Sequence, residues 1–478
     1  MTADANKPYD LAIIGSGSAA FSAAIHAVTQ GASVVLVEQG TVGGTCVNVG
    51  CVPSKALLAA AEARHIADTQ AFPGISTQAG AVDMESLILG KKSLVEELRY
   101  EKYENLAKVY GFSILHGTAT FNEDGSLLVS HRGSSSQTTE VVFANHYVIA
   151  TGATPSIPAV PGLESVPYLT STTAMELSEV PESLVVIGAN AVGLEQAQLF
   201  SHLGAKVTVI ELRSRIAPFE EPEISQVLTE VLEDEGIEIL PSSSIEQVSG
   251  SAGAIHIELV RSGERRSLDV TTLLVATGRV PNTAGLGLEN VGVKVGPHAE
   301  VVVDDQLRTS NPKIYAAGDV TGGPQFVYVA GQHGTIAVDN ALSGMGRKVD
   351  YRTLPRVTFT TPQIASVGLT DEEAVRAGYR CECRVVNLSS VPRAIVNRDT
   401  RGLVKIVADS DTNKVLGIHL LANGAADSIL AGVYALEANF TVDQLASIWA
   451  PYLTMAEAIR LGAQSFGRDV SLLSCCAS

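Results

Sequence analysis

The chain has 478 residues, of which 46% are hydrophobic and 18% charged, and its formal net charge is -18. This composition is typical of a folded protein with roughly three domains, and the charge argues against nucleic acid or an anionic membrane as a partner. The first residues lack the pattern of a signal peptide, and no apolar run approaches the ~18 residues of a membrane helix, so we expect a cytoplasmic protein.

A nucleotide-binding pattern opens the chain. The apolar run at 11–14 is typical of a buried strand, and it leads into Gly-Ser-Gly-Ser-Ala-Ala at 15–20 and a helical stretch to Gln30. A second apolar strand ends in Glu38. The glycines allow pyrophosphate to approach a helix N-terminus, and the acid can bind ribose hydroxyls. The pattern therefore predicts a dinucleotide-binding βαβ unit.

Two cysteines follow, in the run Gly-Gly-Thr-Cys-Val-Asn-Val-Gly-Cys-Val-Pro-Ser-Lys at 43–55. Positions five apart on a regular helix are separated by about 7.5 Å along its axis, whereas a disulfide needs Cα atoms within about 7 Å. If they bridge, Cys46 lies on irregular backbone and a helix begins at about Cys51 and runs to His65. The helix N-terminus and Lys55 would favour the thiolate of Cys51.

We favour a redox dithiol over half of a zinc site or two buried thiols. Zinc needs a second ligand pair at matching spacing, and the chain offers none. A long helical stretch then covers about 84–110 and contains Tyr103.

The nucleotide pattern recurs at 184–211. A strand leads into Gly-Ala-Asn-Ala-Val-Gly at 188–193, and the whole pattern ends in Glu211. The segments 15–38 and 188–211 are equally long, so we expect two related domains that bind two dinucleotides. Asn190 takes the place of the middle glycine, and we expect the turn to survive because Asn tolerates positive φ.

Two arginines follow the second acid and bear on the choice of nucleotide. Arg213 and Arg215 could meet the 2′-phosphate of NADPH, although Glu211 would repel it. The alternative is that both arginines belong to a solvated loop. We favour NADPH.

Two similar turns, Ala-Thr-Gly-Ala at 150–153 and Ala-Thr-Gly-Arg at 276–279, suggest chain crossovers between domains. A strand at 313–317 is followed by Gly-Asp at 318–319, and the carboxylate of Asp319 is suited to bind a flavin's ribityl hydroxyls. From about residue 351 the chain has strands but no nucleotide pattern, which is typical of an α+β module.

On these motifs the chain resembles the flavoprotein disulfide reductases over nearly its whole length. The resemblance implies an α/β fold with two Rossmann-like dinucleotide-binding domains and a C-terminal α+β dimerisation domain. It places an FAD domain at 1–150 and 279–350, an NAD(P)H domain at 151–278 and the dimerisation domain at 351–478. It also implies a homodimer, and a pair formed by Lys55 and Glu195 beside the flavin ring. The expected cofactor-binding residues for FAD and NADPH are Gly15, Gly17, Glu38, Gly44, Thr45, Lys55, Thr151, Gly152, Asp319, Gly188, Gly193, Arg213, Arg215 and Gly278.

The end of the chain departs from the thiol-handling members, which carry His-Pro and a following Glu there. Here the stretch at 450–457 is Ala-Pro-Tyr-Leu-Thr-Met-Ala-Glu, and no histidine follows His419. The usual general acid for a thiol product is therefore missing. Instead the chain ends with Cys475 and Cys476, and soft thiolates select soft metal ions such as Hg(II). These features resemble the mercuric reductases within the family.

That resemblance implies that NADPH reduces FAD and that FAD reduces a Cys46–Cys51 disulfide. Hg(II), arriving as thiol complexes, would bind Cys475 and Cys476 of the partner subunit and pass to Cys46 and Cys51, where it is reduced to Hg(0). Tyr103 and, across the dimer interface, Tyr452 would lie near the metal.

Two other functions remain open at this stage. A large-type thioredoxin reductase would also use a C-terminal cysteine pair but would need the missing His-Glu acid, and a metal-sequestering protein would consume no nicotinamide. We assign no role to Cys381 and Cys383, and we expect no N-terminal metal-binding module because the nucleotide fold begins by Asp10.

Overall fold

The computed structural model describes residues 7–131 and 138–470, which form two compact units. Unit 1 comprises Met1–Ala56, Glu85–Ser156 and Gly278–Val349, and unit 2 comprises Leu57–Met84, Ile157–Thr277 and Asp350–Ser478. Cys475 and Cys476 lie outside the described residues.

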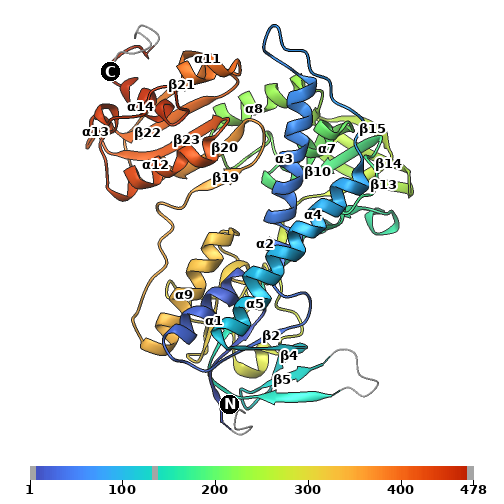
Figure 1. Ribbon diagram of the computed structural model, residues 1–478, viewed down its shortest axis with the longest axis vertical. Coiled ribbons are helices and arrows are strands. Elements are labelled where there is room, and N and C mark those ends of the chain that lie inside the picture. Colours follow the sequence, from blue (N-terminus) through green and yellow to red (C-terminus); the bar gives the residue numbers. More distant parts are fainter. Residues whose placement is uncertain (1–6, 132–137, 471–478) are drawn as a thin grey trace. The chain divides into compact units, whose positions relative to one another are not determined.

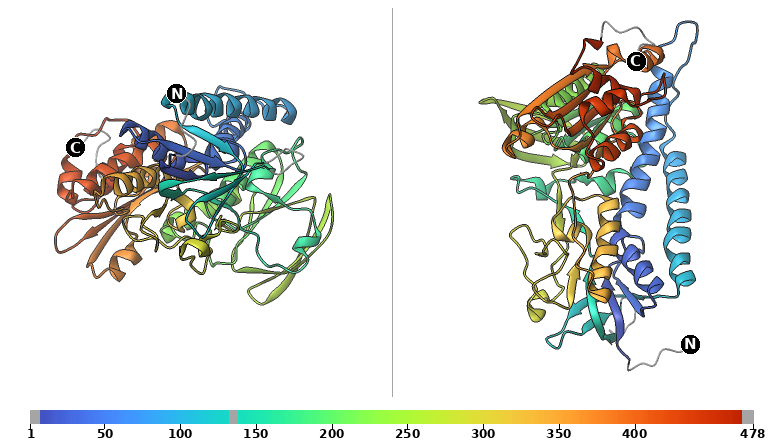
Figure 2. Two further views of the ribbon diagram at one scale, coloured as in Figure 1. Left: turned by 90° about the horizontal axis from the view of Figure 1, so that it is seen from below. Right: turned by 90° about the vertical axis from the view of Figure 1, so that its left-hand side faces the viewer.

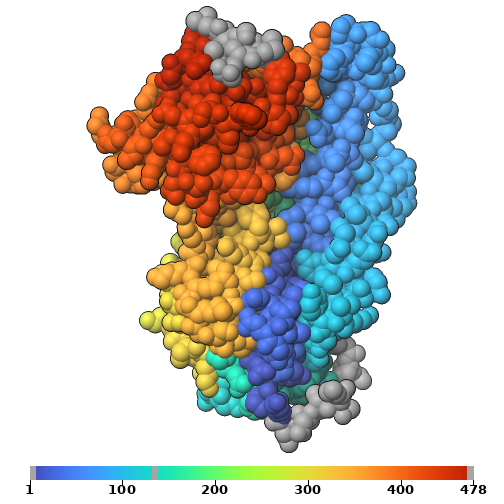
Figure 3. Space-filling model, turned by 60° about the vertical axis from the view of Figure 1, so that its left-hand side comes forward, coloured from blue at the N-terminus to red at the C-terminus, as the bar shows by residue number. Residues whose placement is uncertain are grey.

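Unit 1 is built on a parallel sheet with the strand order β18-β7-β1-β2-β3, of which β2 is labelled in Figure 1. Its inner strands are continuous apolar runs, as expected for a parallel sheet that is covered on both faces. Helices α1 and α9 lie side by side on this unit (Figure 3), and His26 Nε2 of α1 lies 2.6 Å from Asp339 Oδ1 of α9. The elements are β1 (Tyr9–Ile14), α1 (Ser18–Thr29), β2 (Val34–Glu38), β3 (Ser113–His116), β7 (Ala144–Ile149), β18 (Ile314–Ala316) and α9 (Val327–Ser343).

Two smaller antiparallel sheets complete the strands of unit 1. Strands β4 (Thr118–Phe121), β5 (Leu127–Ser130) and β6 (Thr139–Val142) contribute Phe121, Leu127 and Val129 to a core shared with the parallel sheet. Strand β8 (Ala153–Pro155) pairs with β17 (Arg279–Pro281). This pairing brings the two similar Ala-Thr-Gly turns of the sequence to neighbouring strands.

The helix predicted from about Cys51 is confirmed: α3 (Cys51–Asp68) begins at that residue. Cys46 lies within a separate short helix, α2 (Gly44–Val49). The irregular backbone at Cys46 was expected for a bridged pair, and here the two cysteines are not bridged. Gly50, at φ -127° and ψ -113°, separates the two helices. The long helical stretch consists of α4 (Met84–Arg99), a π-helical turn (Tyr100–Glu104) and α5 (Asn105–Tyr110).

Unit 2 contains a second parallel sheet, with the order β12-β11-β10-β16-β9. An antiparallel sheet, β13-β14-β15, shares a core with it through side chains such as Val185, Val248 and Ile257. The elements are β9 (Leu169–Thr170), α6 (Ser171–Ala174), β10 (Ser183–Ile187), α7 (Ala191–Leu203), β11 (Lys206–Ile210), α8 (Pro222–Asp234), β12 (Glu238–Leu240), β13 (Ser243–Ser251), β14 (Ala254–Arg261), β15 (Glu264–Val270) and β16 (Thr272–Val275).

The rest of unit 2 is an antiparallel sheet, β19-β20-β23-β22-β21, with helices packed against it (Figure 2). Helix α12 contacts β20 and β23, while α14 contacts β21 and β22. The elements are β19 (Arg356–Thr358), β20 (Gln363–Gly368), α10 (Asp371–Arg376), β21 (Cys381–Asn387), α11 (Pro392–Asn397), β22 (Leu403–Asp409), β23 (Val415–Ala422), α12 (Ala425–Glu437), α13 (Val442–Ser447) and α14 (Glu457–Gln464). The predicted α/β fold with two parallel sheets and a C-terminal α+β module is confirmed. Within the described ranges, no helix has both the length and the apolar character needed to cross a membrane.

Candidate active site

The glycine loop of unit 1 joins β1 to α1. Gly15 has φ +110°, and a Cβ there would lie 2.4 Å from the carbonyl oxygen of Ala150, so only glycine fits. Ser16 donates a hydrogen bond to Glu38 Oε2 (2.6 Å), and the Gly40 backbone N–H donates to Glu38 Oε1 (2.6 Å). The acid predicted to bind ribose therefore also braces the loop.

The dithiol segment rests directly on this glycine loop. Gly44 has φ +66°, and a Cβ there would lie 2.5 Å from the Cα of Gly17. Two backbones touch at this point because neither residue has a side chain. The helix that carries Cys46 thus begins against the turn predicted to hold pyrophosphate.

Cys46 and Cys51 are brought together at the junction of α2 and α3, and they are not joined by a disulfide. A hydrogen bond between the two side chains, with burial as a second cause, raises the pKa of the Cys46 thiol far above its usual value. The charge of Lys55, on the first turns of α3, acts in the opposite direction. The reduced pair therefore holds one proton firmly at Cys46.

Asn48 fixes the shape of the cysteine segment, and sequence reasoning missed it. Its Nδ2 donates to the carbonyl oxygens of Val42 (3.0 Å) and Gly44 (2.9 Å), and its Oδ1 accepts a hydrogen bond from Arg99 Nη1 (3.2 Å). The only sequence signal was an amide between the two cysteines.

Tyr103 lies in the π-helical turn and reaches the dithiol. Its ring packs edge-on against Phe21, with the centroids 4.8 Å apart. Burial raises the pKa of the Tyr103 phenol, which is hydrogen bonded to Ser18 and interacts electrostatically with Cys46 and Cys51. The phenol therefore stays protonated beside the two sulfurs. The π-helical turn is a common feature of functional sites because its extra residue changes where side chains point.

Asp319 lies in unit 1 on the turn after β18, opposite a cation that sequence reasoning did not assign to the site. Burial raises the pKa of Asp319, and Arg279, whose Nε lies 3.7 Å from Asp319 Oδ2, opposes that shift. Arg279 also donates to the Ala153 carbonyl oxygen and to Thr45 Oγ1 (3.4 Å). The signal in the sequence was the arginine that ends the second Ala-Thr-Gly turn.

Three further predicted residues lie on the two similar turns at 150–153 and 276–279. Thr151 donates from Oγ1 to the carbonyl oxygen of Asn282 (2.7 Å), which holds the two crossovers together. Gly152 and Gly278 have φ of +68° and +124°, values that favour glycine. The structure places all three in unit 1.

The glycine loop of unit 2 repeats the first. A Cβ on Gly188 would lie 2.5 Å from the carbonyl oxygen of Ala276, and one on Gly193 would lie 1.9 Å from that of Gly188. Glu211 accepts hydrogen bonds from the backbone N–H groups of Ala189 and Arg213 (2.8 Å each), which is the arrangement found at Glu38.

Our reason for tolerating Asn190 is wrong, although the turn is preserved. Asn190 has φ -102° and ψ -173°, which is extended backbone, and Gly17 has nearly the same conformation. Positive φ is not required at this position, so the residue need not be glycine or asparagine on backbone grounds.

The two predicted arginines have different surroundings. Arg215 is committed to its own loop, since it donates to the carbonyl oxygens of Glu220 (2.6 Å) and Pro218 (3.0 Å) and to Ser225 Oγ (2.9 Å). Arg213 instead places its guanidinium 4.7 Å from the ring centroid of exposed Phe219. Arg213 is therefore the arginine available to a phosphate.

The remaining predicted catalytic residues belong to unit 2 or lie outside the described part of the chain. Glu195 is buried in α7 of unit 2, where its Oε1 accepts a hydrogen bond from the backbone N–H of Phe359 (2.9 Å). Tyr452 is half exposed in unit 2, and the terminal pair, Cys475 and Cys476, lies outside the described residues.

Cys381 and Cys383 alternate along β21 in unit 2 and therefore share one face of that strand. Burial raises the pKa of both thiols, that of Cys383 to about 12, and the charge of Asp371 acts in the same direction. Both are protonated at neutral pH, which makes them slow nucleophiles.

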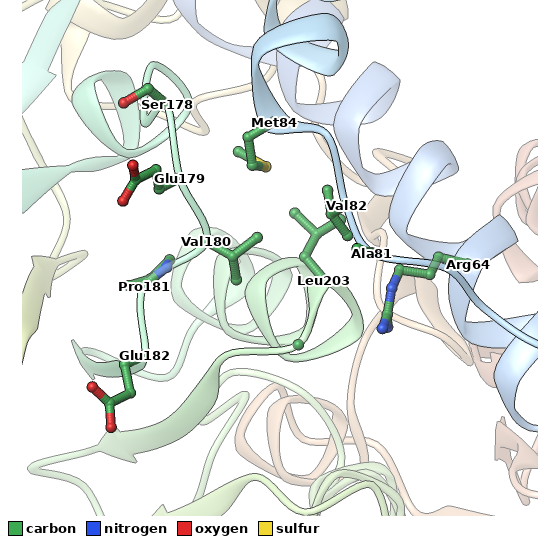
Figure 4. A pocket seen from close by; sticks show the side chains of 11 residues that line it. Arg64, Ala81, Val82, Met84, Ser178, Glu179, Val180, Pro181, Glu182 and Leu203 are labelled. Carbon is green, nitrogen blue, oxygen red and sulfur yellow. The ribbon is translucent and has the colours of Figure 1, made fainter.

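A separate surface pocket of about 370 Å³ lies in unit 2 (Figure 4). Arg64 of α3, Leu203 of α7 and the segment 178–182 line it, together with residues 81, 82, 84 and 204. None of these residues belongs to a glycine loop or to the dithiol, so the pocket is not part of the candidate active site.

Comparison with protein families matches both parts of the chain. Residues 9–334 match the pyridine nucleotide-disulphide oxidoreductase family, and residues 354–463 match the dimerisation domain of pyridine nucleotide-disulphide oxidoreductases.

Known proteins similar to the chain cover nearly its full length. Mercuric reductase of Streptomyces lividans is 55% identical over 99% of both chains. Mercuric reductase of Lysinibacillus sphaericus is 47% identical over 98% of this chain and 84% of that protein. Among solved structures, the Cu(II) complex of the HOCl-induced flavoprotein disulfide reductase RclA from Escherichia coli has 31% identity and a TM-score of 0.86, covering 97% of this chain and 100% of that one.

Proposed function

The chain belongs to the pyridine nucleotide-disulphide oxidoreductase family, and we propose that it is a mercury(II) reductase that uses FAD and NADPH to reduce Hg(II) to Hg(0). Mercuric reductases at 41–55% identity over nearly the whole chain support the reaction. The cytoplasm suits this chemistry because it supplies NADPH and keeps thiols reduced.

The residues of unit 1 fit FAD. The cradle formed by Gly15, Gly17 and Gly44 leaves backbone where a Cβ would collide, which is what close approach of a pyrophosphate requires. Asp319 would accept hydrogen bonds from ribityl hydroxyls, and Arg279 keeps that carboxylate ionised against burial. FAD, when bound, would carry electron pairs from NADPH to the dithiol.

The glycine loop of unit 2 fits the second nucleotide. Two backbone N–H groups donate hydrogen bonds to the Glu211 carboxylate, which would offset part of its repulsion of a 2′-phosphate. Arg213 would bind that phosphate, while Arg215 maintains the loop. Both features favour NADPH, and they support an NAD(P)H domain at 151–278, with the FAD domain at 1–150 and 279–350 and the dimerisation domain at 351–478.

Cys46 and Cys51 would bind Hg(II) as two thiolates. The incoming metal forms a bond to each sulfur, displaces its two thiol ligands, and releases the proton held at Cys46. Tyr103 stays protonated and can donate a hydrogen bond to a sulfur as its charge changes. An electron pair originating from NADPH then reduces the metal to Hg(0), which leaves both sulfurs.

Delivery of the metal completes the proposal. Cys475 and Cys476 of the partner subunit would capture Hg(II) thiol complexes and pass the ion to Cys46 and Cys51 by ligand exchange, with Tyr452 near the route. Lys55 and Glu195 would form the pair beside the flavin. The homodimer agrees with the match to a dimerisation domain.

The observation that carries the proposal is the dithiol held against the glycine loop, with a partly buried, protonated tyrosine beside it. The test measures NADPH oxidation by FAD-loaded protein in excess small thiol, with and without Hg(II), while trapping mercury vapour. We expect Hg(II)-dependent oxidation with one Hg(0) formed per NADPH, abolished in Cys46→Ser and Cys51→Ser. The variant Cys381→Ser/Cys383→Ser is the matched control and should retain activity.

The tail is tested separately, with thiol limiting. Cys475→Ala/Cys476→Ala should then lose turnover, whereas it should retain turnover with abundant small thiol. NADPH oxidation that requires thioredoxin or another disulfide and yields no mercury vapour would overturn the proposal in favour of a large-type thioredoxin reductase. Stoichiometric Hg(II) binding without NADPH consumption would indicate a sequestering protein instead.

A further inference from the structure

A second cluster of metal-ligating side chains lies in unit 2, and none of its residues belongs to a glycine loop. His65 of α3, His202 of α7 and Glu235, which follows α8, place one ligand atom each within 4.8 Å of one another. The two imidazole rings are stacked, with centroids 3.8 Å apart and planes at 11°. Three segments that are distant in sequence therefore bring two imidazoles and one carboxylate together.

We propose that His65, His202 and Glu235 bind one divalent metal ion of the Zn(II) class, independently of the cysteines. Two imidazole nitrogens and a carboxylate oxygen are a ligand set for Zn(II), Co(II), Ni(II) or Cu(II), whereas Hg(II) prefers thiolates. A water molecule would take the fourth position.

The distances in the cluster agree with a tetrahedral ion. Ligands about 2.1 Å from such an ion lie about 3.4 Å from one another. His202 Nε2 lies 3.0 Å from Glu235 Oε2, and His65 Nε2 lies 3.6 Å from Glu235 Oε1. Both rings thus present Nε2 to the carboxylate, each to a different oxygen, and χ2 of a histidine is a soft torsion that allows the rings to adjust to an ion.

Neighbouring side chains orient the Glu235 carboxylate by hydrogen bonds, as residues that contact the ligands commonly do at metal sites. Gln198 Nε2 donates to Glu235 Oε2 (2.8 Å) and Arg401 Nη1 donates to Glu235 Oε1 (2.8 Å). The charge of Arg401 is largely offset by Asp399, which contacts both its Nε (2.9 Å) and its Nη2 (3.0 Å). The cluster therefore carries a net negative charge, which favours binding of a cation.

The ligands are sheltered but not sealed. The side chains of His202 and Glu235 are 5% and 6% exposed, while that of His65 is 17% exposed, which gives an ion a route in.

The ion would fasten the end of the helix that begins at Cys51. Arg64 Nη1 already donates to the carbonyl oxygen of His202 (2.7 Å), next to the pocket shown in Figure 4. Metal bonds from the neighbouring histidines would add a second link between α3 and α7. The ion would be structural and would play no part in electron transfer.

The test titrates oxidised, FAD-loaded holoenzyme with Co(II) and records the visible d–d spectrum. We expect one Co(II) per chain, with no thiolate-to-cobalt charge-transfer band, and an increase in the unfolding temperature when Zn(II) is added. The variants His65→Asn and Glu235→Gln should weaken Co(II) binding by about tenfold or more, since even outer partners account for that much. His65→Asn is the primary variant because its side chain is the most exposed of the three.

A matched control tests whether any histidine beside acids would bind. His256 lies 2.7 Å from Asp269 and 3.9 Å from Glu258 on an exposed hairpin, without a second histidine. His256→Asn should leave the stoichiometry, the spectrum and the Zn(II) effect unchanged. Equal Co(II) binding by the wild-type protein and His65→Asn, a thiolate band, or absence of binding would each overturn the proposal, and none of these outcomes bears on mercury reduction.

Discussion

The raised pKa of the Cys46 thiol depends chiefly on one neighbour, Cys51. Their hydrogen bond is the first cause of the raised pKa, and burial is the second. We therefore expect Cys46 to keep its proton in the reduced enzyme until a metal ion displaces it.

Replacing Cys51 by Ala should lower the pKa of Cys46 towards that of an ordinary thiol. The variant removes both the hydrogen bond and the neighbouring charge that raise it, so Cys46 should form thiolate, and react with iodoacetamide, at lower pH than in the reduced wild-type enzyme. The rate of Cys46 alkylation is measured against pH by peptide mass spectrometry.

Cys383 provides an internal reference in the same digests. Its pKa of about 12 results chiefly from burial in unit 2, so its alkylation profile should not move in the variant. An unchanged profile for Cys46 would show that Cys51 does not hold the proton there.

Arg213 and Arg215 are a matched pair for nucleotide selection. Arg213→Gln should raise the KM for NADPH by about tenfold or more with little change in kcat, because a hydrogen bond to a charged group contributes about 1.5–3 kcal/mol. The KM for NADH should hardly change. Steady-state kinetics with both nucleotides measures the effect.

Arg215→Gln should instead lower the unfolding temperature, because the substitution breaks three hydrogen bonds of the 215–225 loop. If Arg213→Gln affects both nucleotides equally, Arg213 does not contact the 2′-phosphate.

At the level of elements, the close approach of the Gly15 backbone to the Ala150 carbonyl oxygen can be tested by comparing Gly15 with Gly31, since both glycines have positive φ. Gly15→Ala should abolish FAD binding, because the added Cβ would lie 2.4 Å from a carbonyl oxygen, whereas Gly31→Ala, at φ +86° with nothing within 4 Å, should cost only about 1 kcal/mol. Flavin content after purification and the unfolding temperature are the measurements. Equal loss of flavin in both variants would mean that positive φ, and not contact, sets the requirement.

The two βαβ units were predictable because each depends on local chemistry, with apolar strands, glycine turns and a terminal acid at fixed spacing. The brace at Glu38 was not predictable, because its partners Ser16 and Gly40 suggest no hydrogen bond by spacing alone. Arg279 reaches Asp319 only through the pairing of β8 with β17, which is a tertiary event.

The helix around Tyr103 also contains a feature that the sequence did not predict. Hydrophobic spacing predicted helix over 84–110 but gave no sign of the π-helical turn at Tyr100–Glu104, since its residues are ordinary helix formers. Packing of Tyr103 against Phe21 favours that turn, and a sequence window does not contain this contact. Similarly, no local pattern joins His65 to His202 and Glu235.

At the level of the whole molecule, an exposed aromatic side chain bears on assembly. Trp449 is 98% exposed, and Ile448 and Tyr452 beside it are 44% and 47% exposed. Apolar surface of this kind marks an interaction site, and tryptophan is enriched among residues that dominate interfaces. We therefore place this segment in the interface of the proposed homodimer.

Trp449→Glu should weaken the dimer by at least about tenfold, because it removes an aromatic anchor and introduces a charge at the interface. Sedimentation equilibrium measures the dimer dissociation constant. Val141→Glu, on exposed β6 of unit 1, is the control and should remain dimeric. Hg(II) turnover should fall in parallel with dimer content if the active site needs both subunits. A Trp449→Glu protein that stays dimeric would remove this segment from the interface.

The matching braces of the two glycine loops have a historical consequence. In each loop an acid lies 23 residues after the first glycine and accepts two hydrogen bonds. Glu38 accepts them from Ser16 and Gly40, and Glu211 accepts them from Ala189 and Arg213. This shared bracing, between segments of equal length, agrees with two copies of one ancestral gene segment, although Ser16 donates from its hydroxyl and Ala189 from its backbone N–H. The copies differ after the acid, which is followed by Gln-Gly in the first and by Leu-Arg-Ser-Arg in the second. A change of cofactor would then need only a few codons, while the inherited frame stays the same.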